Sequence, residues 1–191
     1  NKLSFDAPSV STGADEYVSD PSKPVPYQDG TGIKRTREYM IDDQRFASRR
    51  PDVLVYETEV LDKDITLAGP LNADLIISTT GTDGDFIVKL IDVYPDSLKS
   101  YQLNNKEVLI GGYQMLVRGE VMRARYRNSY EKPEALTPGK TEQVKFYLPD
   151  VMHTFKKGHK IMVQVQSSWF PLVDRNPQKF VESIYQANDE D

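Results

Sequence analysis

The chain has 191 residues, of which 38% are hydrophobic and 28% charged, which is enough apolar material for one large domain. Its formal net charge of -5 argues against non-specific nucleic-acid binding, which needs a concentrated basic face. The lack of cysteine excludes disulfides, thiolate catalysis and cysteine zinc sites. No stretch approaches the roughly 18 apolar residues that a membrane span requires.

Residues 1–50 are rich in Pro, Ser, Asp and Gly and have no sustained periodicity. Pro21, Pro24 and Pro26 lack amide donors and bias the residues before them toward extended geometry. The sequence therefore predicts an extended lead-in without helix, packed on a sandwich that occupies residues 51–191. Together they form a single domain.

From Pro51 onward, short runs rich in Val, Ile, Tyr, Phe and Thr are bounded by Gly, Pro, Asn and Asp, which is typical of strands. Strict alternation in 144–148 and 161–166 predicts strands with one buried face, and the continuous apolar run 86–93 predicts a central strand. Only 95–103 and 177–187 have weak helical spacing. The predicted strands are 53–60, 64–68, 73–80, 86–94, 108–117, 121–126, 141–147 and 161–167.

Eight such strands fill two sheets, and the absence of internal repeats argues against solenoids and propellers. We therefore predict an all-β fold, a jelly-roll β-sandwich of the galactose-binding-domain-like type with little helix.

Few residues could carry chemistry. The Gly-x-Ser-x-Gly elbow of α/β serine hydrolases is missing from the sequence. His153 and His159 flank a loop before the last predicted strand, and we interpret them as structural or solvent-exposed rather than as a catalytic base. Asp83 and Asp85 stand in a glycine-containing run that resembles the opening of a calcium loop but lacks its later glutamate. We interpret that run as a turn that Asp and Gly stabilise before the central strand, and we predict no metal site.

Two further groups allow alternatives. Arg118, Arg123, Arg125 and Arg127 could form an anion-binding stripe, with the last three on one face of a strand, or could pair with acidic residues of neighbouring strands or a partner domain, which we favour. Trp169 and Phe170 could bind a sugar or peptide ligand, plug one end of the sandwich, or form interdomain contacts. The structural role is favoured.

Several blocks, in one register along nearly the whole chain, resemble the C-terminal domain of α-amino-acid ester hydrolases. The longest is STTGTDGDFIVKLIDVYP at positions 78–95. The others are YVSDP at 17–21, PVPY at 24–27, DQR at 43–45, RPDV at 50–53, RARYR at 123–127, GHKIMVQV at 158–165, SWFP at 168–171 and DRN at 174–176. Related members include glutaryl-7-aminocephalosporanic acid acylases, bacterial cocaine esterase and X-Pro dipeptidyl-peptidases.

This resemblance implies an accessory jelly roll that follows an α/β-hydrolase domain holding a Ser-His-Asp triad. No triad residue has a counterpart in these 191 positions, so the resemblance implies no catalytic residue and no cofactor in this chain. Residues 37–40 resemble the loop that reaches the substrate cleft in relatives, which makes Tyr39 and Met40 the candidate cleft-wall residues, while Trp169 and Phe170 are candidate interdomain contacts.

The implied partners are the α/β-hydrolase domain of the same parent chain and, through it, a small ester or amide substrate, with no nucleic acid and no membrane. A homo-oligomeric parent and an exported bacterial protein also agree with the resemblance. The alternative function is an independent carbohydrate-binding β-sandwich, because the same fold hosts both roles. Sugar binding by the isolated chain would favour the alternative.

Overall fold

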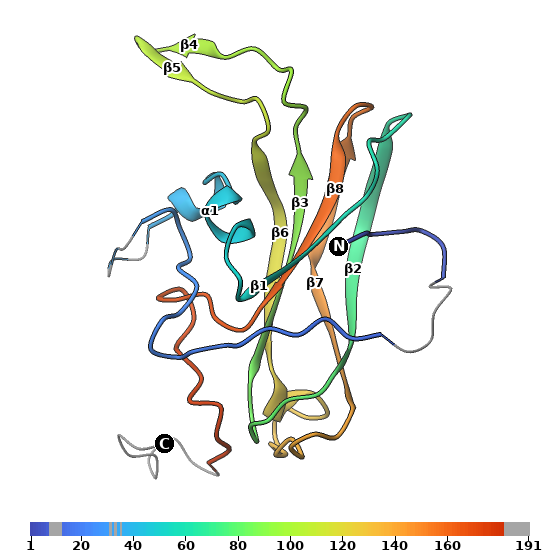
Figure 1. Ribbon diagram of the computed structural model, residues 1–191, viewed down its shortest axis with the longest axis vertical. Coiled ribbons are helices and arrows are strands. Elements are labelled where there is room, and N and C mark those ends of the chain that lie inside the picture. Colours follow the sequence, from blue (N-terminus) through green and yellow to red (C-terminus); the bar gives the residue numbers. More distant parts are fainter. Residues whose placement is uncertain (8–12, 31, 33, 35, 182–191) are drawn as a thin grey trace.

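The computed structural model describes residues 1–7, 13–30, 32, 34 and 36–181, and most of their regular structure is strand (Figure 1). One layer is a four-stranded antiparallel sheet in the order β1 (Val53–Glu57), β8 (Lys160–Gln166), β3 (Asp85–Val93) and β6 (Gln114–Arg123). The second layer pairs the long strands β2 (Ile65–Ile77) and β7 (Glu142–Phe155). This is the predicted all-β jelly-roll sandwich with little helix.

The main core lies between the two layers, where alternate residues of each strand point inward. Phe86, Val88 and Leu90 of β3 face this core, together with Val144 and Phe146 of β7. All five are at most 8% exposed. The predicted alternation in 144–148 is confirmed, because Val144, Phe146 and Leu148 are buried between exposed neighbours. The one wet face predicted for 161–166 is wrong, because Gln164 and Gln166 on that face are fully buried beneath the lead-in.

The other face of the four-stranded sheet is covered by the lead-in. Tyr27 packs with Ile87 and Trp169 on this outer face, and Val25 packs with Ala47 and Val53. Backbone bonds tie the lead-in to the chain after β8, as Phe170 N–H donates to the Val25 carbonyl at 3.1 Å. Strand β3 is therefore buried on both faces, as predicted for the central strand.

The prediction of no helix in the lead-in is wrong in detail. A 3-10 helix η1 (Glu38–Met40) and one turn of α-helix, α1 (Arg45–Ser48), lie beyond its prolines. The prolines restrict only their own neighbourhood, whereas Ala47 is fully buried against the sheet and fixes that turn by tertiary packing.

The helical spacing at 95–103 is also misleading, because the chain there leads into a hairpin of β4 (Tyr101–Leu103) and β5 (Lys106–Val108). Its two-residue loop, Asn104 and Asn105, has φ of 50° and 61°, the left-handed geometry of a type I′ turn. The hairpin stands away from both layers (Figure 1). Six strands rather than the predicted eight build the two layers, because β2 and β6 each span two of the predicted strands.

Other boundaries also differ from the prediction. The strands expected at 64–68 and 73–80 form the single strand β2, whose register shifts after Gly69 (φ 110°). The strands expected at 108–117 and 121–126 correspond to the single strand β6, which ends at Arg123, directly before the 3-10 helix η2 (Ala124–Tyr126). In the segment 177–187, where the helical spacing is weak, residues 177–181 are irregular and 182–187 lie outside the described residues. Among the described helices, none is long and apolar enough to span a membrane.

Candidate functional site

The predicted cleft residues Tyr39 and Met40 lie together in η1, but their side chains have different surroundings. The Tyr39 ring packs on the rings of Tyr27 and Trp169, at centroid distances of 5.6 and 5.7 Å. Met40 is 54% exposed and the next residue, Ile41, is 71% exposed. Tyr39 thus packs within the domain and supports the loop from below. Met40 and Ile41 together form what we call the apolar tip, because both side chains are exposed.

Polar contacts hold the chain that follows the apolar tip. The Asp43 carboxylate accepts hydrogen bonds from Arg45 Nε at 2.7 Å and from the Gln114 backbone at 3.3 Å. This carboxylate raises the pKa of the Arg45 guanidinium by hydrogen bonding to it. The Tyr113 hydroxyl donates to the Ile41 carbonyl. The apolar tip is therefore fastened to the start of β6 and does not depend on its own short helix for order.

Lys89 lies beneath this segment, fully buried in the middle of β3. Its Nζ donates to Gln44 Oε1 at 3.0 Å and lies 5.1 Å from the Trp169 ring centroid and 5.7 Å from that of Phe46. Burial lowers the pKa of Lys89 to about 7, because removal from water disfavours the charged amine. The amine joins the sheet to the lead-in through the hydrogen bond to Gln44 and the ring of Phe46, and it also contacts Trp169, which follows β8.

Trp169, a predicted interdomain contact, is 5% exposed and packs within the domain. It lies on the outer face of the sheet rather than plugging an end. Gly119 of β6 lets it approach, since a Cβ there would lie 3.1 Å from the indole Cη2. Phe170 is only half-buried, and the Arg175 guanidinium lies over its ring at 5.4 Å. Of the two residues, Phe170 keeps surface that a second domain could contact.

Three of the four arginines of the basic cluster are paired with carboxylates, as the favoured interpretation predicts. Arg123 binds Asp85 at 2.9 Å and Arg125 binds Asp83 at 2.6 Å, while both aspartates are 1% exposed. Asn176 Nδ2 donates to both carboxylates. These aspartates pin the turn at 81–85 to η2 and the C-terminal segment.

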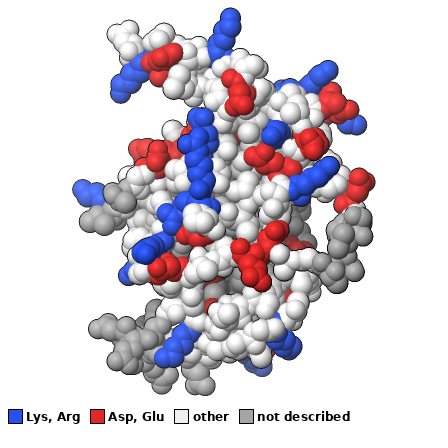
Figure 2. Space-filling view, viewed as in Figure 1, with Lys and Arg blue, Asp and Glu red and all other residues white. Residues whose placement is uncertain are grey.

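Of the other two arginines, only Arg127 has an acidic partner among the described residues. Arg127 binds Glu142 at 2.7 Å, and Arg118 donates to the carbonyls of Val117 and Asp150. The sequence predicts Arg123, Arg125 and Arg127 on one face of a strand. They do not share a strand face, because η2 interrupts the strand after Arg123. Figure 2 shows basic and acidic side chains interspersed over the visible face. An anion-binding stripe is thereby disfavoured.

His153 and His159 converge on one buried carboxylate. Asp92, 2% exposed, lies 2.9 Å from His153 Nε2 and 2.7 Å from His159 Nδ1. The cluster joins β3, β7 and the start of β8, in agreement with the structural interpretation of both histidines. Among the described residues, no group of three or more His, Cys, Asp or Glu side chains could hold a metal ion.

Sequence reasoning missed Lys89 and the hydrogen bond to Gln44. A signal was present, because a lysine within the apolar run 86–93 is unexpected in a strand predicted to be covered on both faces. The partner could not be found in the same way, since Gln44 is 45 residues away in an irregular segment.

These features define a class: an all-β domain without a nucleophile elbow, whose polar groups pin its own segments and whose lead-in presents an apolar tip. A family model described as the X-Pro dipeptidyl-peptidase C-terminal non-catalytic domain matches residues 2–189. The chain belongs to this family.

Similar proteins are longer hydrolases. Cocaine esterase of Rhodococcus sp. (strain MB1 Bresler) is 36% identical over 163 residues, which make up 85% of this chain and 26% of that protein. An aminopeptidase structure from the marine sediment archaeon Thaumarchaeota archaeon superposes with a TM-score of 0.87 at 44% identity, covering 99% of this chain and 31% of that one. An alpha-amino acid ester hydrolase structure gives 0.85 at 42% identity, covering 98% and 30%. The chain thus spans about a quarter to a third of these relatives and corresponds to their non-catalytic C-terminal domain.

Proposed function

We propose that this domain packs on the α/β-hydrolase domain of its parent protein and forms one wall of a cleft in which an ester or amide bond is hydrolysed. The observation that carries the proposal is the apolar tip: Met40 and Ile41 are exposed, yet they are supported by the partly buried Tyr39 ring and fastened to Tyr113, just before β6. A fixed apolar wall excludes water from a reaction whose nucleophile lies in another domain.

The two predicted cleft residues have different roles in this proposal. Met40 contacts the substrate, since its unbranched thioether adapts to varied apolar groups. Tyr39 does not contact the substrate, and its ring holds the apolar tip in position by packing on Trp169. Phe170 contacts the neighbouring domain, and Trp169 supports that contact from inside.

The β4–β5 hairpin supports the packing part of the proposal. A hairpin without a third strand is marginally stable in water, and this one exposes apolar side chains. Leu98, Tyr101, Leu103 and Leu109 are between 37% and 66% exposed along it. We assign the catalytic domain as its cover, because the relatives are three to four times as long as this chain.

The ester or amide substrate class comes from the family and its named relatives. An amino-acid ester and an X-Pro amide are therefore the substrates to test. Oligomerisation of the parent is a separate property, measured by light scattering of the purified protein.

The proposal is tested by steady-state kinetics of the full-length parent carrying Met40→Asp. A charge on the wall disfavours an apolar substrate group, so KM rises by about tenfold or more, in the range that single pocket contacts contribute. The matched control is Met152→Asp, since Met152 is 79% exposed on β7. Equal kinetic effects of the two variants, or no effect from either, contradict the proposal that Met40 lines the substrate cleft.

A further inference from the structure

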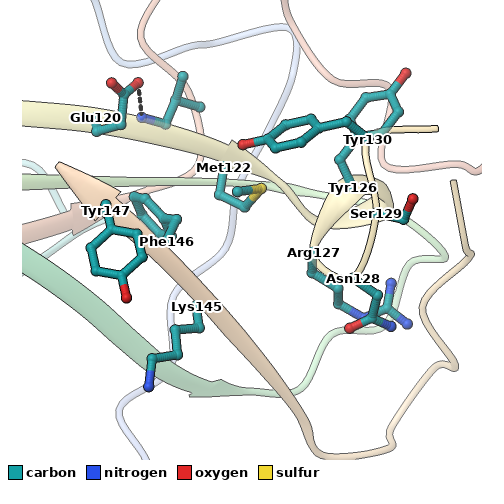
Figure 3. Close-up of a pocket in the computed structure, with 11 residues that line it drawn as sticks. Glu120, Met122, Tyr126, Arg127, Asn128, Ser129, Tyr130, Lys145, Phe146 and Tyr147 are labelled. Carbon is teal, nitrogen blue, oxygen red and sulfur yellow. Dashed lines mark hydrogen bonds between the residues drawn. The ribbon is translucent and has the colours of Figure 1, made fainter. Parts of the chain in front are cut away.

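A groove lies at the open edge of the sandwich, between β6 and β7 (Figure 3). It is lined by residues 120–122, 126–130 and 145–147, so the lead-in does not contribute to it. Each of these strands pairs on one side only, β6 with β3 and β7 with β2. The groove has a volume of about 450 Å³, and Met122 and Phe146, both nearly buried, form its floor. We call it the tyrosine groove after the residues at its rim, Tyr126, Tyr130 and Tyr147.

The rim exposes aromatic surface. Tyr126 and Tyr130 stack with a centroid distance of 6.1 Å and an interplanar angle of 25°. Tyr130 is 76% exposed and Tyr147 is 69% exposed. Within the described part of the chain, the three phenol hydroxyls have no hydrogen-bond partner. Rings and hydroxyls are both available to a ligand.

Arg127 holds the segment that carries the stacked tyrosines. Its side chain binds Glu142 at 2.7 Å and donates to the carbonyls of Ala124, Glu134 and Ala135. With its side chain 5% exposed, Arg127 is an internal clamp. The rim is preorganised, which lowers the ordering cost of binding.

The edge of β6 is closed to an added strand by its own side chains. The Glu120 carboxylate accepts a hydrogen bond from the Val121 backbone N–H at 2.9 Å, drawn in Figure 3. Arg118 donates to the Val117 carbonyl at 2.8 Å. An extended peptide needs these backbone groups, so β-augmentation is disfavoured here.

Of the three charged side chains that line the groove, Lys145 and Arg127 are paired with carboxylates, whereas Glu120 bonds, within the described part of the chain, only to the Val121 backbone N–H. Lys145 lies 3.5 Å from Asp74, and Arg127 is paired with Glu142. Asn128 and Ser129 add polar atoms at the rim, and the Ser129 hydroxyl has no acceptor among the described residues. A neutral ligand that has both an apolar face and hydroxyl groups fits such a surface better than an anion does.

We propose that the tyrosine groove binds a pyranose unit of a neutral glycan, whose C–H face packs on the exposed tyrosine rings and whose hydroxyls bond to the polar rim. This site is separate from the apolar tip and does not depend on the proposed cleft, so sugar binding in the tyrosine groove is compatible with the accessory role and does not by itself favour an independent carbohydrate-binding domain. It gives the parent hydrolase a means of attachment to a polysaccharide or glycoconjugate surface.

The test is an amide NMR titration of the 191-residue chain with maltohexaose, cellohexaose, xylohexaose and chitohexaose in turn. At least one of these sugars is expected to give saturable shifts confined to residues 120–130 and 145–147. Tyr130→Ala and Tyr147→Ala each weaken binding by about two- to tenfold, the share of one aromatic contact. Tyr101→Ala is the matched control, because Tyr101 is 48% exposed on the hairpin, and it leaves affinity unchanged.

The same titration identifies failure. No shift with any of the four sugars overturns the proposal, as do shifts outside the groove or an affinity that Tyr130→Ala leaves unchanged. Both substituted tyrosines are largely exposed, and thermal denaturation checks that the variants fold. Calorimetry on the full-length parent completes the test: binding to the 191-residue chain but not to the parent means that another part of the parent covers the groove, which also overturns the proposal.

Discussion

The two faces of the four-stranded sheet are both shielded from water, but they are built from different chemistry. The inner face buries apolar side chains such as Phe86, Val88 and Leu90 against β2 and β7. The outer face buries Lys89, Gln164 and Gln166, each fully, beneath a lead-in with little regular structure. One face is a strand-on-strand core, and the other contains a polar layer.

This difference in chemistry affects how the segment that covers each face is positioned: strands β2 and β7 on the inner face and the lead-in on the outer face. Apolar burial is non-directional, and strand periodicity already fixes the register between the layers of the inner face. The lead-in has no such periodicity. A directional hydrogen bond from Lys89 to Gln44, three residues beyond Ile41, supplies the missing constraint. The outer face thus positions the apolar tip, at a cost in stability that the inner face does not carry.

The largest effect is expected from Phe155→Ala on the inner face. Phe155 is fully buried in the inter-layer core, and truncation of such a phenylalanine costs about 3–5 kcal/mol of unfolding free energy. Urea denaturation of the 191-residue chain measures it. Met152→Ala, three residues earlier and exposed, stays within about 0.5 kcal/mol of wild type. If Phe155→Ala lowered the unfolding free energy by no more than Met152→Ala does, the result would contradict the burial of Phe155 in the inter-layer core.

Lys89→Met on the outer face is expected to stabilise the protein near pH 7. The pKa of Lys89 is lowered to about 7 by burial, whereas the unfolded chain keeps the ordinary lysine value. The folded state therefore binds fewer protons than the unfolded state between these two values, and wild-type stability rises with pH across that window. Below about pH 7 the whole penalty, of order 5 kcal/mol, is present.

Methionine removes that penalty but also loses the hydrogen bond to Gln44 and the aromatic contacts. We expect a net gain of about 2–4 kcal/mol at pH 7, which falls to nothing or reverses as the pH approaches the ordinary lysine pKa. Denaturation of wild type and variant side by side measures the difference. Lys145→Met, at a half-exposed lysine, gives no such pH-dependent difference. A Lys89→Met difference that is the same at all pH values rules out titration of Lys89.

A smaller effect is expected from Gly119→Ala, which disturbs only the contact with Trp169. The added Cβ would lie 3.1 Å from the indole, and overpacking of this kind costs about 1–3 kcal/mol. Trp169 is the chain's single tryptophan, so its fluorescence reports the displacement directly. Gly13→Ala, where a Cβ meets nothing within 4 Å, is the control. An unchanged emission spectrum in Gly119→Ala would show that the indole does not need this gap.

The sequence predicts the inner face well because its strands are periodic. The predicted ranges 86–94 and 161–167 agree with β3 and β8 to within a residue at each end. The pairing of arginines with carboxylates was also predictable as a type of contact. Which partners meet was not, because Arg123 and Asp85 lie 38 residues apart and are joined by strand register.

The candidate site was less accessible to sequence reasoning. Family resemblance pointed to Tyr39 and Met40, but only packing separates the supporting ring from the exposed tip. The hairpin was missed because Asn104 and Asn105 adopt left-handed geometry, while Pro95–Leu103 has weak helical spacing. The short helix α1 depends on the tertiary burial of Ala47, which no local pattern reveals.

The most direct test of the accessory role is a turnover assay on an amino-acid ester and an X-Pro amide, with the 191-residue chain alone, the parent's α/β-hydrolase domain alone, and the two mixed. We predict no turnover by this chain alone, little by the α/β domain, and a clear rise on mixing. Turnover by the 191-residue chain itself would contradict the account and would direct attention to His153, His159 and Asp92.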